Sequence, residues 1–131
     1  MLLTLAVFVA GGLGALTRFA VNTTLVRWWK TRSAPEWAGF PAGVFLINMS
    51  GAALLGLITG YVTANASPAA HDFSTIVGVG FLGAYTTFST EAWQELGLLR
   101  ANARSEALAM LISLLLSLAL AALGLWVGAR L

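Results

Sequence analysis

Four long apolar runs, separated by short polar gaps, constrain this chain more than any other feature of its sequence. A helix needs about 20 apolar residues to cross the hydrocarbon of a bilayer, where each backbone N–H and C=O must be bonded within the protein. The runs fall near residues 2–26, 41–62, 73–96 and 107–129. We therefore predict an all-α membrane protein with four transmembrane helices, a single domain over residues 1–131 in the lipid bilayer of the cell inner (plasma) membrane.

Composition supports this class and excludes others. Hydrophobic residues make up 59% of the 131 residues and charged residues only 9%. The gaps leave no room for an extramembrane domain, so we expect no nucleic acid as a partner, and no ATP-binding motif or nucleophile–base pair indicates an enzyme. Cysteine is absent, and the single His71, in a predicted loop beside Asp72, lacks the companions that a metal site requires.

Topology follows from the ends of the runs. The first run begins at residue one without a basic segment or a cleavage site, so we interpret it as a retained helix and not a signal peptide. Tryptophans near the run ends predict interfacial anchors: Trp28, Trp29, Trp37 and Trp126. The first and third gaps share one face and carry five basic residues, Arg27, Lys30, Arg32, Arg100 and Arg104, whereas the other face has only Arg130. This bias predicts a cytoplasmic position for the first and third gaps.

Small residues indicate where the helices pack. Glycines four residues apart, which permit close approach of two helices, occur at Gly56 and Gly60 and again at Gly124 and Gly128. The first run adds a cluster of three: Gly11, Gly12 and Gly14. A bundle of four short helices is too thin to enclose a polar pathway comfortably, so we expect the chain to oligomerise.

Polar residues inside the runs are candidates for function, because a buried amide or hydroxyl needs a partner. Asn48 either bonds a neighbouring helix or lines a path as a donor. Ser113 and Ser117 share one helix face, although each hydroxyl can also bond its own backbone. Arg18 either attracts anions or holds a loop carbonyl.

The third run is a poor continuous helix. Three glycines, Gly78, Gly80 and Gly83, precede a cluster of hydroxyl residues: Thr86, Thr87, Ser89 and Thr90. Glycine weakens a helix, and hydroxyls compete for its carbonyls. We predict a break near Gly83–Thr86, which would free backbone carbonyls and helix N-termini that suit cations and anions respectively.

Three segments together resemble the Fluc/CrcB fluoride channels. They are Gly83–Thr90 (GAYTTFST) in the third run, Gly11–Phe19 (GGLGALTRF) in the first, and Asn48 followed by Ser50 and Gly51 in the second. Their order, spacing and the total length agree with that family over nearly the whole chain.

This resemblance implies an antiparallel, dual-topology homodimer with two fluoride pores and a structural sodium ion at the centre of the interface. By the same resemblance, backbone carbonyls of Gly83 and Thr86 from both subunits hold the sodium. Arg18 lies near the pore vestibule, and five residues belong to the fluoride path: Asn48, Thr87, Phe88, Ser89 and Ser117.

Two features depart from the family pattern. Glu91 occupies the position where the family usually has a second aromatic residue, and a carboxylate there repels an anion unless it is protonated, paired or turned to the vestibule. The basic bias between the two faces is also large for a chain that inserts both ways. A heterodimer with an oppositely oriented paralogue is therefore an alternative to the homodimer.

The resemblance implies a passive fluoride-selective channel that exports fluoride and reduces its toxicity. The alternative is a proton-coupled small multidrug-type transporter. Such transporters have a carboxylate in the first span, and residues 1–26 contain no Asp or Glu. A purely structural membrane subunit would explain the glycines but would leave the hydroxyls of Thr86–Thr90 without a role.

Overall fold

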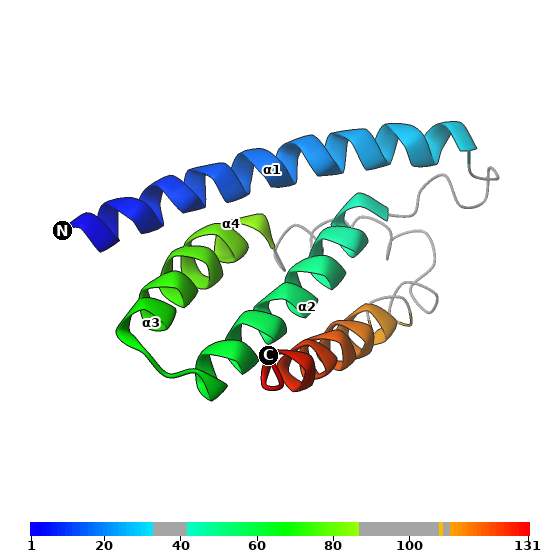
Figure 1. Ribbon diagram of the computed structural model, residues 1–131. Helices are drawn as coiled ribbons and strands as arrows, with labels where there is room; N and C mark the ends of the chain where they lie inside the picture. Colours follow the sequence, from blue (N-terminus) through cyan, green and yellow to red (C-terminus); the bar gives the residue numbers. More distant parts are fainter. Residues whose placement is uncertain (33–41, 87–107, 109–110) are drawn as a thin grey trace.

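The computed structural model describes residues 1–32, 42–86, 108 and 111–131, in which all regular structure is helical (Figure 1). The elements in the first two of these ranges are α1 (Leu2–Arg32), α2 (Ala42–Ala64), α3 (Pro68–Ser74), the π-helix η2 (Thr75–Leu82) and α4 (Gly83–Tyr85). A C-terminal helix covers residues 111–128. Three stretches are long and apolar enough to cross a membrane: Leu2–Trp29, Gly43–Ala64 and Leu111–Gly128. The all-α membrane class is thus confirmed, whereas the further span over 73–96 extends outside the described residues and stays a prediction.

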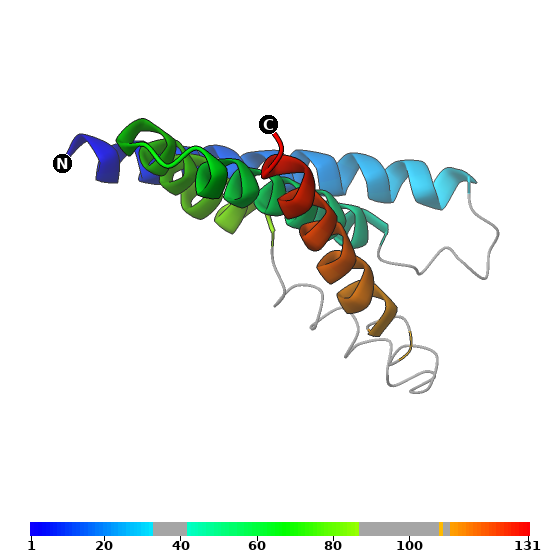
Figure 2. The ribbon, with the colours of Figure 1, turned by 60° about the horizontal axis from the view of Figure 1, so that its bottom comes forward.

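The long helix α1 lies across the arm formed by α3, η2 and α4, and it also contacts α2 (Figures 1 and 2). Glycines make this approach close. A Cβ placed on Gly14 would overlap the backbone of Phe81, and one placed on Gly80 would lie 2.9 Å from the carbonyl oxygen of Val7. Small residues on both helices therefore set the distance between α1 and η2.

The C-terminal helix packs on α2 through the four glycines spaced for close approach. A Cβ on Gly56 or Gly60 would overlap the backbone carbonyl of Ala121 or Leu125. In the reverse direction, a Cβ on Gly124 or Gly128 would overlap the carbonyl of Ala53 or Leu57. The contact is reciprocal, and it confirms the packing role predicted for these glycines.

The helix α1 continues to Arg32, so residues 27–32 are helical and not part of the gap in which the sequence placed them. The guanidinium of Arg32 lies 5.4 Å from the centre of the Trp28 ring, whose centre lies 6.4 Å from that of Trp29. At the end of the C-terminal helix, Arg130 lies 3.6 Å above the Trp126 ring. Each end therefore pairs an aromatic ring with a cation, as expected where apolar and polar surroundings meet.

The prediction of a loop at His71 and Asp72 was wrong, because both residues lie in α3. The side chain of Ser67 caps this helix by accepting a hydrogen bond from the Ala70 N–H at 3.2 Å, and Pro68 follows in the first turn. A serine cap followed by proline is a local start signal for a helix. This start signal, and not the polarity of His71 and Asp72, decides the local structure.

The predicted break in the third run is present. The helix ends at Tyr85, and Thr86 has an extended backbone with φ −84° and ψ 152°. Before the break, residues 75–82 form a π-helix, which the sequence did not indicate. The N–H of Gly83 points at the carbonyls of both Gly78 and Gly80, where the wide turn tightens.

Burial is concentrated where η2 and α4 meet α2. Ile47 is 1% exposed and Leu82 2% exposed, and Tyr85 joins them in one cluster. Many of the leucines of the C-terminal helix are instead exposed, as expected for side chains that face lipid.

Candidate functional site

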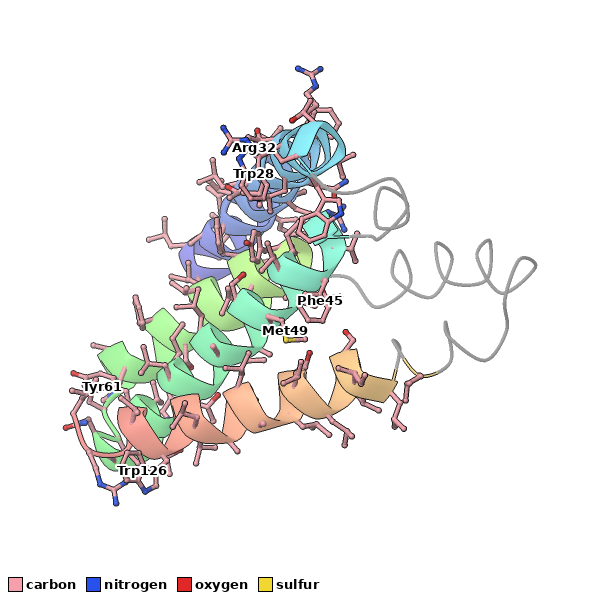
Figure 3. The ribbon with its side chains drawn as sticks, turned by 90° about the vertical axis from the view of Figure 1, so that its right-hand side faces the viewer. Trp28, Arg32, Phe45, Met49, Tyr61 and Trp126 are labelled. Carbon is pink, nitrogen blue, oxygen red and sulfur yellow. The ribbon has the colours of Figure 1, made fainter. Side chains whose placement is uncertain are left out.

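A cavity of about 280 Å³ opens where α2 and the C-terminal helix separate. Figure 3 shows the two helices close together near Tyr61 and Trp126 and farther apart toward Phe45. The glycine contacts hold the near end, so the space between the helices widens toward the other end. Residues of α2, of the broken third run and of the C-terminal helix line it: Asn48, Gly51, Ala52, Leu55, Gly78, Leu82, Gly83, Thr86, Ser113, Leu114 and Ser117.

Asn48 and Ser113 are the two buried polar side chains of the described part of the chain, and both line this cavity. Asn48 lies on the face of α2 that also carries Gly51 and Leu55, at spacings of three and seven residues. Its exposed fraction is 9%, and that of Ser113 is 4%. An amide from one helix and a hydroxyl from another thus meet a largely apolar cavity.

Ser117 lies one helical turn beyond Ser113, as the sequence predicted from their spacing. Its Oγ is 4.0 Å from the sulfur of Met49. Figure 3 shows the Met49 side chain between α2 and the C-terminal helix. The sulfur is a weak acceptor, so the Ser117 hydroxyl can exchange this contact for a better acceptor at small cost.

The broken helix supplies Gly83 and Thr86 to the cavity wall. The Thr86 N–H and the Thr86 hydroxyl both donate to the carbonyl of Leu82, each at 2.9 Å. The hydroxyl hydrogen of Thr86 is therefore used in the bond to Leu82, and the hydroxyl oxygen can act only as an acceptor for other groups. The carbonyl of Leu82 therefore accepts two hydrogen bonds from the residue at which the helix ends.

Gly83 and Thr86 are the residues that the sequence resemblance names as ligands of a sodium ion. Unwound backbone carbonyls are the sodium ligands of discontinuous membrane helices, and the extended Thr86 ends the helix at the residues named for this role.

No charged side chain is among the described residues that line the cavity. Arg18 lies half-buried on α1 and does not belong to this lining. The polar groups are neutral, and the low dielectric of their surroundings makes each hydrogen bond stronger than it would be in water. Such a site can bind a small anion through hydrogen bonds without holding it by a fixed opposite charge.

Asn48, Gly83, Thr86 and Ser117 are therefore brought together in the described structure. Thr87, Phe88 and Ser89, and also Glu91 and Trp37, lie outside the described residues. Sequence reasoning did not assign Ser113 to the path, although its spacing from Ser117 was a usable signal. It also missed Met49, because a methionine in an apolar run carries no distinguishing pattern.

Long apolar helices around a largely apolar cavity with a few neutral polar groups define a multi-pass helical protein of the cell membrane. Residues 5–129 match the family of the CrcB-like protein, Camphor Resistance (CrcB), and the chain belongs to this family. The resemblance stated from the sequence motifs is thus confirmed.

Curated relatives carry the name of an ion channel. The Fluoride-specific ion channel FluC 1 of Leifsonia xyli subsp. xyli is 38% identical over 97% of this chain and 87% of its own length. The Fluoride-specific ion channel FluC 2 of Bacillus cereus is 36% identical over 98% of both chains. The FluC 2 of Nitrobacter hamburgensis is 48% identical over 65% of this chain and 62% of its own. A family of channels agrees with the expectation that the chain is not an enzyme.

Proposed function

We propose that this protein is a passive, fluoride-selective channel that lets a cell export fluoride and so reduces its toxicity. The observation that carries the proposal is its similarity, over nearly the whole chain, to relatives named as fluoride-specific ion channels. The cavity supports it independently, because its polar groups are neutral and suit an anion.

The chemistry of fluoride favours such a lining. Fluoride is small and strongly hydrated, so a pore must replace its water with other hydrogen-bond donors. The amide of Asn48 and the serine hydroxyls are donors of this kind. Conduction also requires that the ion leaves again, and neutral donors bind less tightly than a paired cation does.

We assign the path to Asn48 and Ser117 in the cavity and to Thr87, Phe88 and Ser89, which directly follow its wall in the sequence. The edge of a phenylalanine ring is weakly positive, so Phe88 can contact an anion while excluding water. Arg18 is assigned to the vestibule, where a cation raises the local concentration of anions.

The proposed assembly is an antiparallel homodimer with two pores and a sodium ion at the centre of its interface. Carbonyls of Gly83 and Thr86 from both copies are its proposed ligands, because one copy offers too few oxygens. When bound, sodium supplies a positive charge that lowers the cost of bringing an anion into a low dielectric. The helix ends at these proposed ligands, because Thr86 has an extended backbone.

Fluoride efflux from liposomes that contain only this purified protein tests the function. We expect fast release of fluoride and none of chloride, with protein-free liposomes as the control. Release of both anions would contradict selectivity. No release from a well-folded protein would contradict a homodimeric channel.

A further inference from the structure

A hydrogen bond joins Ser50 of α2 to Tyr85 of α4. Other residues of both helices line the cavity, whereas Ser50 and Tyr85 do not. The two hydroxyl oxygens lie 3.1 Å apart. The Ser50 hydroxyl also lies 3.1 Å from the carbonyl oxygen of Ile47, to which it can donate. Either hydroxyl can be the donor in the contact between Ser50 and Tyr85.

The Tyr85 ring is held firmly. Its exposed fraction is 9%, and it belongs to the buried cluster with Ile47 and Leu82. The ring stacks on Phe81 with centroids 5.9 Å apart and an angle of 14° between the planes. This packing restricts the ring and places its hydroxyl against Ser50. The hydrogen bond therefore fixes the end of α4 relative to α2.

The next residue makes a second contact with the same part of α2. A Cβ placed on Gly51 would overlap the Cγ2 methyl of Thr86. Consecutive residues of α2, Ser50 and Gly51, thus meet consecutive residues at the break, Tyr85 and Thr86. Gly51 and Thr86 both line the cavity, which places this double contact at its wall.

We infer that Ser50 and Tyr85 are a positioning pair that holds the end of the broken helix, at Tyr85 and Thr86, against α2. The pair holds the carbonyls of Gly83 and Thr86 in place at the cavity that Asn48 also lines. This role rests on the proposed channel function. The sequence gives the pair no signal, since serine and tyrosine lie 35 positions apart in different runs.

A matched set of substitutions separates the hydrogen bond from packing. Ser50→Thr keeps the hydroxyl, and Ser50→Val has nearly the same shape as threonine without it. Tyr85→Phe removes the tyrosine hydroxyl and keeps the ring that stacks on Phe81. Ser50 is exposed in this chain, so an added methyl has room.

We expect fluoride efflux of Ser50→Thr to match that of the unsubstituted protein. Ser50→Val and Tyr85→Phe should each lose efflux several-fold, and the double variant should lose no more than the worse single variant, since both remove the same interaction. Tyr61→Phe, at the exposed end of α2, serves as the tyrosine control.

Raman spectroscopy of tyrosine gives a readout that does not depend on flux. The chain has two tyrosines, so a Tyr61→Phe background reports on Tyr85 alone. The spectrum of a hydrogen-bonded tyrosine is expected in this background with Ser50 in place and also in Ser50→Thr, and it should be lost in Ser50→Val. The size-exclusion profile and unfolding temperature of each variant are measured in parallel.

Each failure has its own pattern. If the unsubstituted protein releases no fluoride, the proposed function fails and the inference fails with it. If that protein conducts and Tyr85→Phe conducts equally well, or if the two losses add, only the inference is overturned. Loss of efflux that accompanies loss of the folded peak in both Ser50→Val and Tyr85→Phe would also overturn it, in favour of a structural role.

Discussion

Asn48 brings an amide, with two N–H donors and one acceptor, to a cavity whose other polar side chains are hydroxyls. Asn48→Leu keeps the size of the side chain and removes the donors. A hydrogen bond to a charged partner contributes about 1.5–3 kcal/mol, so we expect fluoride efflux to fall about tenfold or more. Liposome efflux measures this, and the size-exclusion profile should match that of the unsubstituted protein.

Asn65→Leu is the matched control at the residue scale. Asn65 lies just after α2, and its amide donates to the carbonyl of Tyr61 at 3.2 Å, away from the cavity. Its efflux should equal that of the unsubstituted protein. Equal efflux in Asn48→Leu would remove Asn48 from the proposed path.

At the scale of elements, the contact between α2 and the C-terminal helix depends on glycine. A methyl on Gly124 would overlap the carbonyl of Ala53, whereas a methyl on Gly12 meets nothing within 4 Å. Gly124→Ala forces the helices apart, and overpacking costs about 1–3 kcal/mol. Gly12→Ala should leave stability unchanged or slightly raised, because alanine favours a helix. Thermal unfolding in detergent distinguishes them, and equal temperatures would refute the packing role.

For the whole molecule, the prediction concerns its orientation in the membrane. The chain contains no cysteine, so Thr31→Cys at the exposed end of α1 provides a single labelling site. In an antiparallel homodimer, an impermeant thiol reagent should label about half of the protein from each side of the membrane, because identical chains insert both ways. Intact cells and inverted vesicles give the two measurements.

The labelling result also tests the basic bias of the sequence. One-sided labelling of a protein that conducts when expressed alone would end the dual-topology proposal. One-sided labelling of a silent protein would instead favour a heterodimer with an oppositely oriented paralogue. Leu131→Cys, at the C-terminus, repeats the test at a second site.

Local patterns predicted much of this fold. The break at Thr86 could be predicted because glycines and hydroxyls weaken a helix wherever they occur together. The α2 contact could be predicted because glycine spacing describes one helix face. The helical His71 was missed because polarity was weighed above the Ser67 cap and Pro68. The π-helix over residues 75–82, which packs against α1, was not predicted.

By itself the sequence determined the membrane class, the helix-forming runs and the place of the break, because each depends on the chemistry of neighbouring residues. Only the tertiary structure decided which polar residues meet. It brings Asn48 and Ser117 to one cavity and pairs Ser50 with Tyr85. The physical reason is that glycine contacts at one end of α2 and the C-terminal helix set the separation of these helices at the other end. No local sequence pattern predicts that separation.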